Sequence, residues 1–172
     1  MDRAVAIANE FLAKAGCDGL TQMQLQKLVY IAHGWCLALT GEPLTADQPE
    51  AWDFGPVYRD LYDHTKYFGS GKINRRLTPA DDNAVNFFLG TRGESPSPYV
   101  ASLNESERSI IEHVWGRYGT LTGGRLSAMT HKPNTPWSQT FKNGAGKSRT
   151  IDNAVIKSHY EEIAESVRQA RD

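Results

Sequence analysis

The side chain best suited to acid–base chemistry in this 172-residue chain is His131, which follows Thr130 and precedes a proline-containing segment that ends at Trp137. Imidazole exchanges protons near neutral pH, so a histidine beside a pocket can act as a general base. No nucleophile signature accompanies it, neither G-x-S-x-G nor a cysteine in an activating context. We therefore favour a structural role, in which the ring binds backbone groups where a helix ends before Pro133, over a hydrolase centred on His131.

Two further motifs resemble binding sites and are incomplete. Residues 144–148 read GAGKS, the end of a phosphate-binding loop, but the full pattern requires glycine at position 141, which is Phe141. His33 and Cys36 have the i, i+3 spacing of two metal ligands on one helix face, but a zinc site needs three or four ligands. We expect no catalytic residue, no cofactor and no metal site.

Aromatic and basic residues are the better candidates for contact with a partner. Trp52, Phe54 and Tyr58 flank the Gly55-Pro56 turn, and aromatic side chains carry much of the binding energy at protein interfaces. Two small basic patches could contact phosphates or an acidic protein if they met in space. One consists of Lys72, Arg75 and Arg76, and the other of Lys142, Lys147 and Arg149. Alternatively, the aromatic residues fill the core, and the basic residues are solvated charges on surface loops. The candidate interface residues are Trp52, Phe54, Tyr58, Arg75, Arg76, Lys142 and Lys147.

The composition is that of a soluble globular protein. Hydrophobic residues make up 40% and charged residues 23%, and the formal net charge is −1 with a pI near 6.5. This balance gives no electrostatic case for nucleic acid or an anionic membrane. The two cysteines fit a reducing compartment, and the N-terminus lacks the long apolar region of a signal peptide. We expect a cytoplasmic protein without a membrane span.

Residues 20–41, LTQMQLQKLVYIAHGWCLALTG, must position these groups. Thr21 followed by Gln24 has the spacing of a capping box at a helix start, and Gly41 stands where a helix ends. Between them apolar residues recur at three- and four-residue spacing, and from Leu28 onward the other faces are apolar too. A helix that is apolar nearly all round is buried, so we expect the other helices to pack around it.

Capping residues, glycines and apolar spacing predict the remaining elements. Asp152 to Arg168 should turn Ala154, Val155, Tyr160, Ile163 and Val167 inward. The segment 131–137 should be extended because of Pro133 and Pro136, and the polar residues 91–102 should form the most mobile loop. The fold class is mainly α: a compact single-domain helical bundle around a central helix at about 21–40, with a small two-stranded β element pairing about 50–54 with 72–77. The other expected helices are 2–14, 56–68 with Pro56 first, 78–89, 104–118 and 122–129.

The order of five motifs resembles the Panacea domain family, which contains SocA-like type II antitoxins and phage- or mobile-element-associated proteins. The motifs extend from about residue 4 to 165, and residues 78–104 correspond to the family's variable middle. They are ANEFL near the start, L-T-x-x-x-L-Q-K-L-V-Y-I-A-H-G-W at 20–35, E-A-W-D-F-G-P-V-Y-R-D-L-Y at 50–62, L-S-x-M-T-H-K-P-N-T-P-W at 126–137 and I-K-S-H-Y-E-E-I at 156–163.

This resemblance implies a non-enzymatic protein that binds and neutralises a toxin encoded nearby. A SocA-like member also delivers its toxin to a cytoplasmic protease. The partner surface would then lie on the loops around 42–55, 70–78, 90–104 or 138–150. The second hypothesis is a DNA-binding repressor that regulates a prophage or mobile-element operon. The motif residues expected to form the scaffold are Leu25, Leu28, Tyr30, Trp35, Gly55, Pro56, His131 and Trp137.

Overall fold

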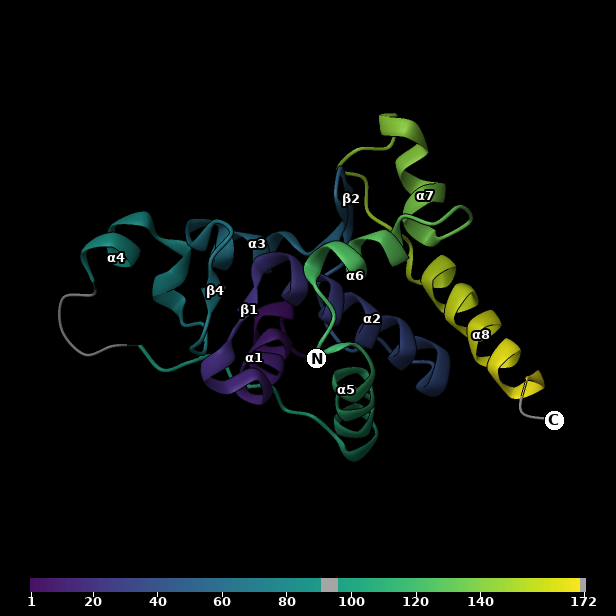
Figure 1. Ribbon diagram of the computed structural model, residues 1–172, viewed down its shortest axis with the longest axis horizontal. Helices are drawn as coiled ribbons and strands as arrows, with labels where there is room; N and C mark the ends of the chain where they lie inside the picture. Colours follow the sequence, from purple (N-terminus) through teal and green to yellow (C-terminus); the bar gives the residue numbers. More distant parts are fainter. Residues whose placement is uncertain (91–95, 171–172) are drawn as a thin grey trace.

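The structure is a computed structural model that describes residues 1–90 and 96–170 (Figure 1). Within these residues the fold is mainly helical, as predicted, with short 3-10 turns at 16–18, 66–68, 79–82 and 142–144. The helices are α1 (Ala4–Ala15), α2 (Gln22–Thr40), α3 (Arg59–Thr65), α4 (Ala84–Leu89), α5 (Glu105–Tyr118), α6 (Gly123–Thr130), α7 (Pro136–Phe141) and α8 (Asn153–Gln169). The strands are β1 (Leu20–Thr21), β2 (Glu50–Trp52), β3 (Gly55–Val57) and β4 (Lys72–Ile73).

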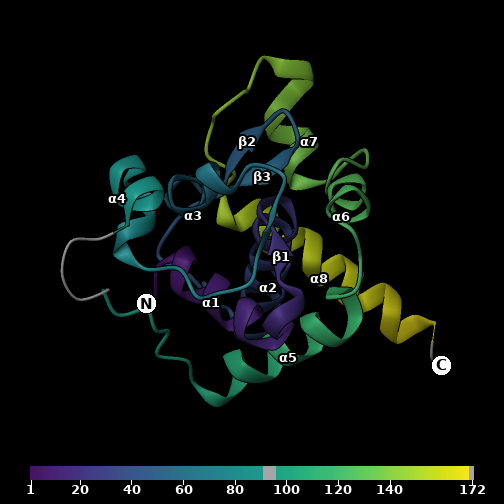
Figure 2. The same cartoon turned by 60° about the vertical axis from the view of Figure 1, so that its left-hand side comes forward.

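Helix α2 is the centre of the fold, which confirms the prediction from residues 20–41. The Thr21 backbone N–H donates to Gln24 Oε1 at 3.0 Å, and the Gln24 N–H donates to Thr21 Oγ1 at 3.3 Å, so the capping box is formed. Leu25 and Leu28 are fully buried. Helices α1, α5, α6 and α8 surround α2 (Figures 1 and 2). One continuous hydrophobic core therefore extends from α1 to α8.

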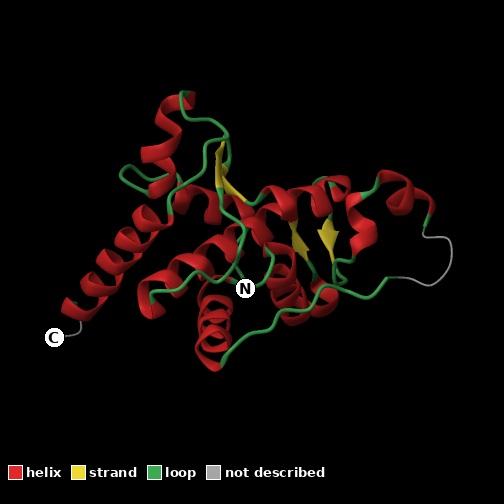
Figure 3. Cartoon of the chain, turned by 180° about the vertical axis from the view of Figure 1, so that it is seen from behind, coloured by secondary structure: helices red, strands yellow, loops and turns green. Residues whose placement is uncertain are grey.

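The strands pair differently from the prediction. Residues 50–54 and 72–77 each contribute a strand, but these strands lie in separate two-stranded antiparallel sheets (Figure 3). Strand β2 pairs with β3, placing Glu50 opposite Val57, and β1 pairs with β4, placing Leu20 opposite Ile73. Gly55 has φ of +102°, which allows the chain to reverse directly after Trp52. The local hairpin therefore forms instead of the distant pairing.

Two proline-containing segments also differ from expectation. The predicted helix 56–68 begins at Arg59, because Pro56 lies in β3 opposite Ala51. The segment predicted to be extended, 131–137, instead turns and starts α7 at Pro136. Thr135 caps this helix by accepting a hydrogen bond from the Ser138 N–H at 3.3 Å. Proline suits the first helical position because its missing N–H would have no intrahelical partner there.

Helix α8 packs through its first half and extends away from the body through its second half (Figures 1 and 3). Asp152 caps it by accepting from the Ala154 N–H at 2.8 Å. Ile156 and Tyr160 are its buried residues. Ala154 and Val167 are exposed, so the expected inward face is wrong at these two positions.

The connection between α4 and α5 returns across α1. Asn9 of α1 donates to the carbonyl oxygens of Leu77 and Tyr99, at 2.9 and 2.8 Å, and accepts from the Leu77 N–H at 2.7 Å. Of the polar segment 91–102, residues 91–95 lie outside the described residues. These hydrogen bonds attach the chain to α1 at Leu77 and at Tyr99.

Candidate partner-binding surface

The β2–β3 hairpin is fixed on one side by two polar residues of α2. The Tyr58 N–H donates to Gln26 Oε1 at 2.8 Å, and Gln26 Nε2 donates to the Tyr58 carbonyl oxygen at 3.1 Å. Lys27 Nζ donates to the carbonyl oxygen of Pro56 at 2.9 Å. Both α2 side chains are buried. Because buried backbone groups need partners, these bonds hold the chain where the short strand pair ends.

On its other side, the hairpin turn is held by the α6–α7 region. Trp137 Nε1 donates to the Trp52 carbonyl at 2.8 Å, and Ser127 Oγ donates to the Phe54 carbonyl at 3.1 Å. Between these two, His131 Nε2 lies 3.2 Å from the Asp53 carbonyl. Three consecutive carbonyls therefore each face a side chain from one distant segment, and the turn is rigidly placed.

The geometry of His131 is that of a structural residue. Its Nδ1 lies 2.6 Å from the Ser127 carbonyl, so both ring nitrogens face backbone acceptors. Its ring packs against Trp137 with centroids 4.0 Å apart. The Ser127 hydroxyl lies 3.3 Å from Nδ1, but it donates its proton to the Phe54 carbonyl, so this hydroxyl and the imidazole both bind groups of the scaffold.

Gly55 permits this close assembly. A Cβ at this position would lie 2.8 Å from Thr130 Oγ1 and 2.9 Å from Lys27 Nζ. Its φ of +102° is also a conformation that other residues rarely adopt. The turn, α2 and α6 therefore meet at a point where only glycine fits.

An open groove runs between this hairpin and the first turns of α2, with a volume of about 300 Å³. Phe54 stands at its edge with 71% of its surface exposed. Trp52 and Tyr62 pack together in its wall, with ring centroids 4.9 Å apart. Met23 and the buried residues Gln26 and Lys27 contribute from α2. The groove thus combines exposed aromatic surface with a rigid backbone.

A charged pair orders the outer wall of the groove. Arg59 binds Glu50 with two hydrogen bonds of 3.1 and 3.0 Å, and its guanidinium lies 4.9 Å from the centre of the Trp52 ring. Trp52 Nε1 also donates to Glu50, at 2.9 Å. Burial opposes ionisation of the Glu50 carboxyl group, but the hydrogen bonds from Arg59 and Trp52 outweigh it and lower its pKa. Trp52 is therefore held in one orientation at the surface.

The structure separates the other predicted interface residues. Tyr58 is fully buried, so it cannot form part of a surface, and that expectation is wrong. Arg75 forms an ion pair with Asp81, with a shortest N–O distance of 2.5 Å, and Lys147 pairs with Asp53 at the same distance. Arg76 and Lys142 are exposed. The basic patch at and after β4 and the one that follows α7 lie in separate parts of the molecule (Figure 1), so they do not combine.

The incomplete motifs have structural partners. His33 Nε2 lies 3.0 Å from Asn153 Oδ1, and Cys36 Sγ lies 3.6 Å from Thr40 Oγ1. The GAGKS segment follows the short helix α7 rather than a strand. Within residues 1–90 and 96–170, no group of three or more His, Cys, Asp or Glu side chains is placed to hold a metal ion.

Sequence reasoning missed the residues that place the hairpin. Gln26 and Lys27 are two adjacent polar residues between Leu25 and Leu28 of the core, and their buried location is the signal that indicates a specific role. Ser127 and Met23 gave no comparable signal, because their contacts depend on segments that are distant in the sequence.

Comparison with known proteins identifies the family. A family model described as "Antitoxin SocA-like, Panacea domain" matches residues 25–138. The chain is also 32% identical over 163 residues to Antitoxin SocA of Caulobacter vibrioides (strain NA1000 / CB15N), a match that covers 91% of this chain and 81% of that protein. The chain belongs to the SocA-like Panacea family. No solved structure matches it.

The Panacea match contains most of the groove and its support. Residues 25–138 include nearly all of α2, the β2–β3 hairpin, α6 and the first turn of α7. Membership places the protein among the SocA-like antitoxins, as the motif order predicted. Among the described residues, no helix combines the length and apolarity needed to cross a membrane.

Proposed function

We propose that this Panacea protein is an antitoxin that binds and neutralises a toxin encoded nearby, by protein–protein contact and without catalysis. The observation that carries the proposal is its 32% identity to Antitoxin SocA across 91% of the chain. The similarity covers 91% of the chain rather than one motif, so it supports a shared role as well as a shared fold.

The toxin contact that we propose is the groove beside Phe54. Exposed aromatic residues and arginines contribute most of the energy at protein interfaces. This groove presents Phe54, Trp52 and Tyr62 together, and Arg59 lies over the Trp52 ring. The turn is already held by Trp137, so little conformational entropy is lost when a partner binds. Neutralisation would follow from covering the active surface of the toxin.

A growth assay tests the proposal. The adjacent open reading frame is induced in a naive host, with and without this protein, and binding is measured by pull-down and calorimetry. We expect the adjacent gene to be toxic and this protein to restore growth. If the adjacent product is harmless, or toxic without rescue or binding, the proposal fails.

Paired variants test the surface. Phe54→Ser should weaken toxin binding at least about tenfold, because truncating an interface anchor costs more than about 1 kcal/mol. Phe88→Ser is the matched control, since Phe88 is 69% exposed but lies on α4, away from the groove. If Phe88→Ser abolishes rescue and Phe54→Ser does not, the toxin binds the α4 end instead.

Delivery of the toxin to a cytoplasmic protease is a separate part of the proposal. It predicts that the intracellular half-life of the toxin shortens when this protein is present. An unchanged half-life together with growth rescue would restrict the mechanism to sequestration.

A further inference from the structure

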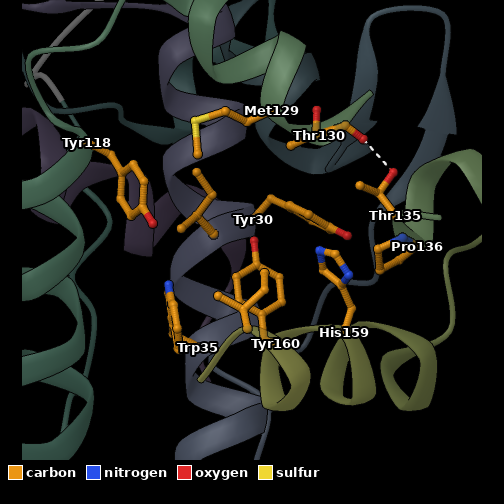
Figure 4. Close-up of a pocket in the computed structure, with 11 residues that line it drawn as sticks. Tyr30, Trp35, Tyr118, Met129, Thr130, Thr135, Pro136, His159 and Tyr160 are labelled. Atoms are coloured by element: carbon orange, nitrogen blue, oxygen red, sulfur yellow. Dashed lines mark hydrogen bonds between the residues drawn. The ribbon is translucent and has the colours of Figure 1, made fainter. Parts of the chain in front are cut away.

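A second site lies where α2, α8 and the end of α6 meet. It is a partly enclosed cavity of about 70 Å³. Aromatic side chains form most of its wall: Tyr30 and Trp35 come from α2, Tyr118 from the end of α5 and Tyr160 from α8 (Figure 4). The Tyr160 ring lies edge-on to both α2 aromatics, with centroids 6.4 Å from Tyr30 and 5.4 Å from Trp35.

Two buried polar atoms in this wall have no hydrogen-bond partner among the described residues. They are the hydroxyl of Tyr30, whose side chain is only 2% exposed, and the indole Nε1 of Trp35. Figure 4 shows the Trp35 nitrogen and the Tyr160 hydroxyl directed toward the cavity from one side, with the Tyr30 hydroxyl on the side of His159. Buried polar groups are normally paired, and exceptions concentrate at functional sites.

The volume of the cavity and the hydrogen-bonding groups in its wall limit which chemical group it can hold. A cavity of about 150 Å³ holds a benzene ring, and this cavity, at about 70 Å³, suits a smaller group. The indole N–H only donates, whereas a tyrosine hydroxyl both donates and accepts. Among the lining residues His159 is the one basic side chain, and burial lowers its pKa, which favours the neutral ring. A carboxylate would therefore lack a counter-charge, whereas a neutral amide matches these donors and acceptors.

The cavity is accessible from the outer face of α8. His159 lines the cavity and two shallow grooves along this helix, and Ile163 lines the cavity and the groove along the second half of the helix. A chain lying along α8 could therefore insert one side chain past His159. Gly34 brings the two helices together here, since a Cβ on it would lie 2.2 Å from the Tyr160 ring.

We propose that this cavity receives the carboxamide end of an asparagine or glutamine side chain from the protein partner. The carboxamide oxygen accepts from the Trp35 indole or a tyrosine hydroxyl, and its N–H group donates to a hydroxyl oxygen. This inference rests on the proposed function for the existence of a partner, and its chemistry is tested without one.

The first experiment titrates the protein with propionamide and records the indole N–H resonances by NMR. Trp35→Phe assigns the Trp35 resonance. We expect a saturable shift of that resonance with propionamide and no saturable shift with sodium propionate. Tyr30→Phe should weaken the propionamide affinity at least fivefold. No saturable response to propionamide, or an equal response to propionate, overturns the proposal.

Tyr58→Phe is the matched control. The Tyr58 hydroxyl is also buried without a partner among the described residues, but Tyr58 does not line the cavity. Its removal should leave the propionamide affinity unchanged. An equal loss in both variants would indicate a general effect on the core and would contradict the proposal.

The second experiment compares stability with binding to the adjacent gene product. Tyr30→Phe should leave the melting temperature unchanged or raise it, because it removes an unpaired buried hydroxyl, and should weaken partner binding at least tenfold. A lower melting temperature with unchanged partner binding would instead assign the hydroxyl to an internal water network. If the wild-type protein binds no neighbouring product, the proposed function fails, and the propionamide titration still decides the chemistry of the cavity.

Discussion

At the scale of single residues, Lys27 is the least expected feature of the fold. Its side chain is almost fully buried, and its amine donates one hydrogen bond, to the Pro56 carbonyl. Burial lowers the pKa of this amine from 10.5 to about 7. The lysine therefore costs the folded state free energy at neutral pH and below, while it helps to fix the hairpin that carries Phe54.

This pKa shift predicts how stability depends on pH. Between about pH 7 and 10.5 the amine is neutral in the folded chain and protonated in the unfolded chain, so the unfolded state binds more protons. Stability from this group therefore rises with pH across that window, by at most about 1.4 kcal/mol per unit. Below about pH 7 both states are protonated and the slope vanishes.

Urea unfolding of the wild type and of Lys27→Met at several pH values measures this contribution. The difference between the two free energies of unfolding should change across the window, with Lys27→Met gaining relative to wild type as the pH falls from 10 to 7. Parallel curves for the two proteins would show that the amine is not desolvated in the folded state.

The exposure of a side chain could be predicted where it depended on the neighbouring sequence alone. Phe54 stands beside a Gly-Pro turn, and its exposure was predictable. Tyr58 follows the same turn, but its backbone is bound by Gln26, a residue that no local pattern connects to it. The alternative roles of His131 could be separated only when the Ser127 and Asp53 carbonyls were located around the ring.

At the scale of elements, local signals placed most helices correctly. Thr21, Asn104, Thr122 and Asp152 each cap the helix that the sequence predicted, because capping depends on residues two or three positions apart. The strand pairing was not predictable in the same way, because the choice between a local and a distant partner depends on tertiary contacts. The start of α7 was missed although Thr135-Pro136 is a local cap signal.

The central position of α2 predicts a large cost for truncating its core. Leu28→Ala should lower the free energy of unfolding by about 2–5 kcal/mol, as large-to-small core changes do. Leu39→Ala on the same helix is the control: Leu39 is 55% exposed, and surface substitutions usually change stability by less than about 0.5 kcal/mol. Equal effects in chemical denaturation would mean that α2 is peripheral.

Where α2 and α8 cross, replacing a glycine by alanine should have the opposite of its usual effect on stability. Alanine usually stabilises a helix interior by about 1 kcal/mol relative to glycine. At Gly34, however, a Cβ would lie 2.2 Å from the Tyr160 ring. Gly34→Ala should therefore destabilise, by about 1–3 kcal/mol, because overpacking displaces the ring.

Gly124→Ala is the control for this variant, because a Cβ at Gly124 in α6 meets nothing within 4 Å. It should leave the melting temperature unchanged or raise it slightly. If Gly34→Ala also raises the melting temperature, α8 is not packed against α2 as described.

At the scale of the whole molecule, the sequence predicted the family and the fold class but not the layout of charge. Lys72, Arg75 and Arg76 lie at and after β4, whereas Lys142 and Lys147 follow α7, and these two segments are apart in the fold (Figure 1). Arg75 and Lys147 are also engaged locally, in ion pairs with Asp81 and Asp53.

This layout bears on the alternative function, a DNA-binding repressor. Affinity for DNA arises largely from lysines and arginines that neutralise adjacent phosphates on one continuous surface. The net charge is −1, and the two basic patches that the sequence suggested lie apart within the described residues. We therefore expect no change in the fluorescence anisotropy of labelled DNA from the protein's own promoter at micromolar protein and physiological salt.

Variants that reverse the charge of one residue in each basic patch test this expectation. Arg76→Glu and Lys142→Glu alter one exposed residue in each patch, and neither should change anisotropy or the rescue of growth. A repressor would instead show binding that weakens steeply with salt, and at least one of the two variants would abolish it. That result would move the function from the aromatic groove beside Phe54 to a basic end of the molecule, and Phe54→Ser would then leave activity intact.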